Sequence, residues 1–223
     1  CFTFLIVETA YGLFWAHIYP FDDTRSTFIV ETDEATWRRA GLDAHAAVPR
    51  RPGENDEASM RFCEEIFAGH LDGHRLIGNN SGWLAFTVMR NEQWSSGNVV
   101  LVGDAAHTAH YSVGSGTKLA MEDAIALVTA LGETDDLETA LTAYEEARRP
   151  AVTRLQDIAE RSRRWWETFP ERLDLPVEQL LVAYMSRAGN VPLDRFAAGT
   201  PDVAHTALRQ WAGEEPPSTR CPA

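Results

Sequence analysis

The chain of 223 residues lacks the features that mark several classes of protein. No apolar run approaches the roughly 18–20 residues that span a bilayer. The cysteines Cys1, Cys63 and Cys221 are few and irregularly spaced, so they form neither a disulfide framework nor a metal-binding motif. Basic residues number 20 against 33 acidic ones, a net charge of −13, which argues against a basic face for nucleic acid. We therefore expect a cytoplasmic protein that needs neither nucleic acid nor a membrane.

Several catalytic patterns are also missing. No His, Asp and Glu grouping has metal-ligand spacing, and neither Ser112 nor Ser115 lies in a nucleophile-elbow motif. No Gly-x-Gly-x-x-Gly follows a strand near the start of the chain, so the usual dinucleotide-binding fingerprint is absent. The chain also begins at Cys1 without Met.

The most informative segment that is present runs from Gly97 to Leu131. The Val99–Val102 run is typical of a strand covered on both faces, as in an α/β sheet. Gly103-Asp104-Ala-Ala-His107 then forms a turn, and a loop leads through Gly114 and Gly116 into a helix over 117–131. A lone Gly-Asp pair would be an ordinary turn. The complete order instead predicts a carboxylate and open helix N–H groups at one crevice, where open α/β sheets bind ligands.

This segment resembles the second flavin-binding motif of the FAD-dependent aromatic hydroxylases of the para-hydroxybenzoate hydroxylase type. Residues 107–124 are most similar to the branch that hydroxylates aryl-CoA thioesters such as salicylyl-CoA. The similarity extends through 14–17, 26–31, 73–76 and 144–150, and covers most of residues 2–190. It implies an α/β fold (α+β overall) with an antiparallel substrate-domain sheet and C-terminal helices, here lacking its N-terminal βαβ unit.

The resemblance assigns roles to particular residues. Asp104 would bind the ribityl chain of FAD, and the helix that begins after Gly114 would point its N-terminus at the flavin pyrimidine edge. The implied FAD-binding residues are Gly103, Asp104, Gly114, Ser115, Gly116, Thr117 and Lys118. Lys118, in the first turn of this helix, either adds to the positive electrostatic field of the helix N-terminus or simply faces solvent. The loop over 108–113 lacks the prolines of the wider family, which agrees with the CoA-ester branch.

Three residues are candidates for substrate chemistry: His17, His110 and Tyr111. His110 and Tyr111 lie in the loop that the family places beside the reactive flavin edge, where they could act catalytically or, for Tyr111, touch substrate. His17 alternates with Trp15 and Tyr19 on a strand and could face the pocket. For His107 we favour a hydrogen bond to the backbone, and for Arg148-Arg149-Pro150 a charged helix end that meets a helix breaker.

Periodicity predicts the organisation of the chain. Three β-rich runs over 2–8, 13–19 and 26–32 indicate an antiparallel meander, and a helix is expected over 57–68. Strands are expected at 76–77 and 83–89, and two helices or a kinked one over 137–168. The arginines and Trp165-Trp166 late in this segment indicate an amphipathic helix with aromatic anchors. We divide the chain into a substrate part (1–92), a second FAD-binding segment (93–133), C-terminal helices (134–198) and a flexible tail (199–223).

The resulting prediction is a portion of an enzyme that hydroxylates an aromatic ring, such as that of an aryl-CoA thioester. It would use FAD, O2 and NADH or NADPH, and the missing N-terminal portion of the same enzyme would be its partner. Two alternatives remain: a flavoprotein of the same fold that hydroxylates a free or carrier-bound metabolite, and a non-catalytic fragment that does not retain FAD.

Overall fold

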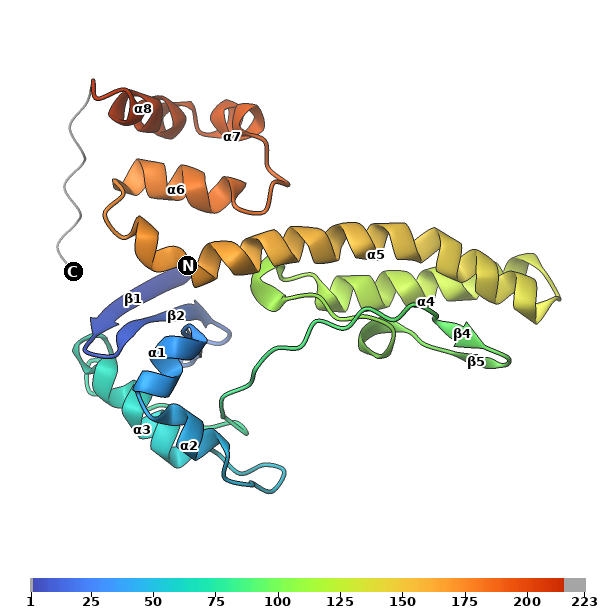
Figure 1. The fold of residues 1–223 in the computed structure, drawn as a ribbon, viewed down its shortest axis with the longest axis horizontal. Coiled ribbons are helices and arrows are strands. Elements are labelled where there is room, and N and C mark those ends of the chain that lie inside the picture. Colours follow the sequence, from blue (N-terminus) through green and yellow to red (C-terminus); the bar gives the residue numbers. More distant parts are fainter. Residues whose placement is uncertain (1, 215–223) are drawn as a thin grey trace. The chain divides into compact units, whose positions relative to one another are not determined.

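The computed structural model describes residues 2–214, which form two compact units divided after Ala85 (Figure 1). Each unit has its own apolar core, and each is described by itself. Among the described residues, no helix combines the length and the apolar character that a bilayer crossing requires.

The first unit is built on the predicted meander. Strands β1 (Thr3–Thr9), β2 (Gly12–Pro20) and β3 (Ser26–Glu31) pair in an antiparallel order, with β2 in the centre. Helices α1 (Glu34–Arg39), α2 (Leu42–Ala46) and α3 (Glu57–Ile66) follow, then a short 3-10 turn at Ala68–His70. Asp33 and Asp56 cap α1 and α3 by accepting backbone N–H groups. Phe14 and Ala16 on β2 pack with Leu42 and Phe67 to form the core.

The second unit is dominated by two long helices, α4 (Gly116–Glu133) and α5 (Leu137–Glu167), which lie along each other (Figure 1). Before α4 come a two-stranded antiparallel ladder, β4 (Ser95–Ser96) and β5 (Val99–Val100), and two 3-10 turns, Gly103–Ala105 and Tyr111–Val113. Their core contains Trp94, Leu119, Tyr144 and Val152. The turn at Gly103 packs against α4.

The end of the described chain is helical. A 3-10 turn at Phe169–Arg172 leads to α6 (Val177–Ser186), α7 (Leu193–Gly199) and α8 (Pro201–Trp211). The expected anchors Trp165 and Trp166 are buried against Phe169 and Tyr184, which confirms an amphipathic helix with aromatic anchors.

The structure corrects several predictions of secondary structure. Residues 76–77 and 83–89 form no strand, because no described segment supplies a partner ladder, and only Arg90 makes an isolated bridge, to His107. The Val99–Val102 run is not a strand covered on both faces: only Val99 and Val100 pair, and Val99 is 61% exposed. Both sheets of the described residues are antiparallel.

Two further predictions fail for reasons of packing. Pro150 does not divide α5, which continues through it, because Tyr144 and Val152 on either side are anchored in one core. Part of the expected flexible tail is helix α8, whose Ala204 and Ala207 are buried with Val182 and Phe196. Residues 215–223 of that tail lie outside the described residues.

Candidate cofactor-binding site

The turn Gly103–His107 is fixed closely against α4. Gly103 has a φ of +60°, a left-handed conformation that glycine adopts without strain. A Cβ placed there would lie 3.0 Å from the Cβ of Ala120 on α4. We expected Gly103 to permit a close approach, and the group that approaches is this helix of the chain itself.

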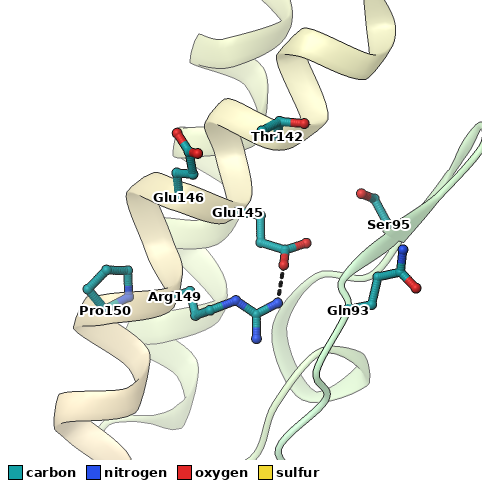
Figure 2. A pocket seen from close by; sticks show the side chains of 7 residues that line it. All are labelled: Gln93, Ser95, Thr142, Glu145, Glu146, Arg149 and Pro150. Atoms are coloured by element: carbon teal, nitrogen blue, oxygen red, sulfur yellow. Dashed lines mark hydrogen bonds and ion pairs between the residues drawn. The ribbon is translucent and has the colours of Figure 1, made fainter.

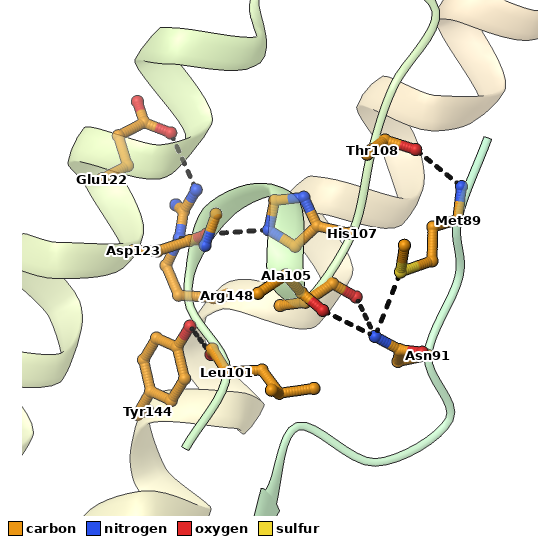
Figure 3. Close-up of polar contacts among 12 residues, drawn as sticks. Met89, Asn91, Leu101, Ala105, His107, Thr108, Glu122, Asp123, Tyr144 and Arg148 are labelled. Atoms are coloured by element: carbon orange, nitrogen blue, oxygen red, sulfur yellow. Dashed lines mark hydrogen bonds and ion pairs between the residues drawn. The ribbon is translucent and has the colours of Figure 1, made fainter. Parts of the chain in front are cut away.

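A single buried carboxylate holds both ends of this turn. Asp123 of α4 is fully buried, and its Oδ2 accepts the Gly103 N–H at 3.1 Å and His107 Nε2 at 2.7 Å (Figure 3). Its other oxygen, Oδ1, accepts Arg148 Nε of α5 at 2.8 Å. Because an ionised carboxylate only accepts, the His107 hydrogen must lie on Nε2. Three donors on two oxygens therefore satisfy a charge that burial would otherwise penalise heavily.

This arrangement corrects two interpretations. His107 binds the Asp123 side chain through its ring rather than a backbone group. Arg148 does not end a helix: it is buried within α5 and reaches Asp123 and Glu122. Asp123 itself lies on the buried face of α4 together with Leu119, one helical turn before it, and Ala130, two turns after it. An acid on an apolar stripe requires partners, and that signal could have identified it from the sequence.

Asp104 has the opposite environment. It is exposed, and no hydrogen bond or ion pair joins its side chain to the described residues. The backbone around it is held instead, since Asn91 Nδ2 donates to the carbonyls of Ala105 and Ala106, each at 2.9 Å. The structure thus presents an unpaired carboxylate on a firmly held turn.

The N-terminus of α4 is open. The N-cap residue Ser115 donates its hydroxyl to the Val113 carbonyl at 3.1 Å and does not cap the helix. Gly114, with a φ of +61°, and Gly116 are exposed, and a Cβ at either would meet no atom within 4 Å. The first turn of α4 therefore lacks a side-chain cap at Ser115 and is bordered by two glycines without crowding neighbours, an arrangement that favours an anion or an electron-rich ring edge.

Lys118 is 72% exposed and lies beside this opening in the first turn. Its Nζ pairs with Glu122 Oε1 at 2.7 Å, and Arg148 contacts the other oxygen of Glu122 at 3.0 Å. The Lys118 ammonium, followed by the Arg148 guanidinium, lowers the pKa of the Glu122 carboxyl. Lys118 is thus within the charged network, and its contact with a cofactor stays a prediction.

His110 and Tyr111 lie together in the loop before α4. Their rings stack with centroids 4.5 Å apart, and Phe86 contacts both edge-on. His110 Nδ1 accepts the Ser112 N–H at 3.3 Å, and Arg187 of the α6 end donates to the Ser112 carbonyl at 3.1 Å. Burial lowers the pKa of Arg187. Phe86 and Arg187 therefore both hold the loop. The Tyr111 residue is 41% exposed, so part of its ring is accessible.

His17 belongs to the first unit and is buried. Its Nε2 pairs with Glu31 Oε1 at 2.7 Å, while Trp15 Nε1 donates to the other oxygen at 3.1 Å. Trp15 and His17 therefore share one face of the sheet, as the alternation predicted. The pairing restrains the imidazole, and its contact with substrate stays a prediction.

A separate groove of about 520 Å³ lies between α5 and the β4 segment (Figure 2). Its central cation, Arg149, binds Glu145 and the carbonyls of Asn91 and Glu92, and lies over the Trp94 ring. The groove therefore offers a cation that is already satisfied. None of the predicted cofactor-binding residues lines it. Among the described residues there is also no cluster of three metal-ligating side chains.

Comparison with known proteins identifies the family of the chain. A family model described as FAD binding domain matches residues 28–159. The turn, the open helix and this match define a flavin-binding protein, and the chain belongs to the FAD binding domain family.

Two relatives are more specific. Salicyloyl-CoA 5-hydroxylase of a Streptomyces species is 53% identical over 75% of this chain and 32% of the relative. The 3-hydroxy-4-methyl-anthranilyl-[aryl-carrier protein] 5-monooxygenase of Streptosporangium sibiricum is 44% identical over 84% of this chain and 46% of the relative. The chain thus spans about a third to a half of the curated relatives that it matches.

Among solved structures, PqsL of Pseudomonas aeruginosa in complex with 2-aminobenzoylacetate matches with a TM-score of 0.50 at 22% identity. It covers 74% of this chain and 44% of PqsL. This likeness shows a shared fold.

Proposed function

We propose that the chain is the C-terminal portion of a flavin-dependent monooxygenase that hydroxylates an aromatic ring with NAD(P)H and O2. Membership of the FAD binding domain family supports the cofactor. The observation that carries the proposal is the pairing of an unpartnered carboxylate, Asp104, with an uncapped helix end at Gly116 in one motif.

The residues present fit FAD in two ways. Asp104 would accept hydrogen bonds from the hydroxyls of the ribityl chain, because none of the described residues donates a hydrogen bond to its oxygens. The open space beside Gly114 and Gly116 lets a flat ring edge approach the N–H groups of α4 without meeting a side chain. The positive end of this helix would favour a negatively charged or electron-rich edge of the bound group.

Bound FAD supplies the transfer of electrons from NAD(P)H and the activation of O2. The chain supplies positioning. We assign the stacked His110 and Tyr111 to the reacting side, where an exposed phenol and an imidazole can orient a substrate hydroxyl. We assign His17 to the substrate side of the sheet. There Glu31 would hold its imidazole in one orientation.

A further portion of the same enzyme is the proposed partner. Helix α4 exposes Met121, Ile125 and Val128, which are 62%, 67% and 70% exposed and follow one another on one face. Large apolar side chains aligned in this way favour a covered face. The greater length of the matched relatives supports a covering segment that carries the dinucleotide-binding fingerprint.

For the substrate we propose an aromatic acyl-CoA thioester, supported by the 53% identity to salicyloyl-CoA 5-hydroxylase. A ring carried on a carrier protein is the second candidate, favoured by the 44% identity over 84% of the chain to a monooxygenase named for such a substrate. NAD(P)H oxidation and hydroxylated product, measured with salicyloyl-CoA, anthraniloyl-CoA, their free acids and an aryl-loaded carrier protein, separate these candidates. Turnover of only the free acids would contradict both.

The cofactor assignment is tested by changing Asp104 in the enzyme that contains this chain. Hydrogen bonds to a charged group contribute about 1.5–3 kcal/mol each, so Asp104→Ala should raise the Kd for FAD by about 10- to 100-fold. Flavin content after purification and titration of the stripped enzyme provide the measurement. Asp135→Ala is the control, because it removes an exposed turn carboxylate outside the motif. Equal flavin content in all three proteins would refute the assignment, and a wild-type protein without flavin affinity would indicate a non-catalytic fragment.

A further inference from the structure

Asp104 cannot set its own position, because its side chain has no protein partner among the described residues. Its place is set by the backbone of the turn Gly103–His107. Within the turn, the N–H groups of Ala106 and His107 both donate to the Gly103 carbonyl, at 2.9 and 3.0 Å. These bonds shape the turn, but they do not attach it to the rest of the fold.

Asn91 holds the middle of the turn through the Ala105 and Ala106 carbonyls, and Asp123 attaches both of its ends to α4. The Asp123 Oδ2 binds the first residue of the turn through the Gly103 N–H and the last through the His107 ring. Both ends of the turn are thus tied to one oxygen atom. That oxygen belongs to α4, the same helix whose open N-terminus forms the other half of the candidate site.

The carboxylate is fixed in turn by α5. Arg148 Nε binds Asp123 Oδ1 at 2.8 Å, and its other nitrogen reaches Glu122 at 3.0 Å. The Asp123 and Arg148 side chains are 0% and 11% exposed, so water competes little for these bonds. Buried charge pairs are costly to desolvate, and well-packed hydrophobic residues in their place often stabilise a fold equally well or better. Stability alone therefore does not explain this set of residues.

We propose that the buried Asp123–His107–Arg148 network is a positioning device for FAD binding, which sets the spacing between the Asp104 carboxylate and the N-terminus of α4. This inference rests on the function proposed above. Binding is strengthened when the contacting groups are already held in the bound geometry, because no ordering cost remains. None of the three side chains needs to touch the cofactor.

The central variant is Asp123→Asn. It keeps the side-chain shape, but an amide has one acceptor oxygen while Gly103, His107 and Arg148 all present donors. If the amide oxygen takes the Oδ2 place, both ends of the turn are kept but the amide nitrogen faces the Arg148 donor; in the other orientation, Arg148 is kept and the turn is released. The network is broken in either case. We expect the Kd for FAD to rise at least 10-fold in the complete enzyme, measured by quenching of flavin fluorescence. The matched control is Asp56→Asn, which alters a buried carboxylate that accepts from Ser59 and Arg50 in the other unit. It should leave the Kd within threefold of wild type.

A conservative rescue separates positioning from bulk. His107→Gln carries a side-chain nitrogen that can still donate to Asp123, whereas His107→Leu has no donor. We expect His107→Gln to bind FAD within about threefold of wild type and His107→Leu to bind about 10-fold more weakly. Far-UV circular dichroism and unfolding of the flavin-free proteins verify that each variant is folded.

A double-mutant cycle tests whether the network acts through Asp104. If it does, Asp123→Asn should raise the Kd much less when Asp104 is already Asn than in the wild-type background. Additive effects, or folded Asp123→Asn and His107→Leu proteins that bind FAD as well as wild type, would overturn the inference. If the affinity for FAD depends on Asp104 but not on Asp123, the positioning inference is overturned while the proposed function stands. Failure of the wild-type enzyme to bind FAD overturns the proposed function as well.

Discussion

The close contact between Gly103 and α4 leads to a quantitative prediction for Gly103→Ala. Two costs arise. A residue with a side chain pays about 1–2 kcal/mol for the left-handed conformation that Gly103 adopts at φ +60°. Its Cβ would also lie 3.0 Å from that of Ala120, and overpacking of this kind costs about 1–3 kcal/mol. The free energy of unfolding should therefore fall by about 2–5 kcal/mol.

The chain contains a matched control for the first of these costs. Gly97, between β4 and β5, has a φ of +57°, but a Cβ there would meet no atom within 4 Å. Gly97→Ala should therefore lose only about 1–2 kcal/mol, the conformational part. The difference between the two variants measures the packing of the turn against α4.

Thermal and urea unfolding of the flavin-free proteins provide the assay. For a chain of this size each kcal/mol lowers Tm by roughly 2–4 °C, so the Tm of Gly103→Ala should lie about 4–20 °C below that of wild type. Adding Ala120→Gly should recover part of the loss, although a glycine within a helix itself costs about 1 kcal/mol. The packing argument would be refuted if Gly103→Ala were no more destabilising than Gly97→Ala. It would also be refuted if the destabilisations of Gly103→Ala and Ala120→Gly simply added in the double variant.

Three other predictions concern α5 and the first unit. Pro150→Ala should raise the free energy of unfolding by about 1–3 kcal/mol, because Pro150 lies inside a continuous helix and lacks an N–H; an unchanged urea midpoint would contradict this. Tyr144 donates to the Leu101 carbonyl at 3.0 Å, and burial raises its pKa to about 12. The unfolded chain releases this proton near pH 10, so wild type should lose stability between pH 10 and 12, a decline that Tyr144→Phe should show less steeply in pH-dependent unfolding. Burial also raises the pKa of Cys63 to about 12, so iodoacetamide at pH 8 should leave Cys63 unmodified in peptide mass mapping until urea unfolds the chain.

Much of the fold was predictable where local pattern and burial agree. The meander β1–β3 follows from short β-rich runs with tight turns between them, and α3 follows from its apolar positions. Helix α4 begins within one residue of the predicted start because glycine and serine precede it. The turn after Gly103 and a helix start without a side-chain cap are both present, whereas the shared crevice for Asp104 and the helix end stays a prediction.

The remaining errors arise where distant residues decide the outcome. Pro150 predicted two helices or a kink, and the division into two helices is wrong, because burial of Tyr144 and Val152 in one core keeps α5 continuous across it. The small residues of 199–211 indicated a tail, yet Ala204 and Ala207 let α8 pack closely on α6 and α7. The 83–89 segment has strand-like side chains, but a strand also requires a neighbour, which the described residues do not provide.

The two acids of the motif show the same division most clearly. Asp104 was identified because its place after a Gly and before a helix is visible in the order of residues. Asp123 was missed as a functional candidate because its importance depends on His107 and Arg148, 16 and 25 residues away along the chain. An exposed acid can bind a ligand tightly only if its backbone stays in place, and here the buried acid holds that backbone together with Asn91. The residue that is easiest to find by its motif is thus one whose effect should depend on another that only the fold reveals.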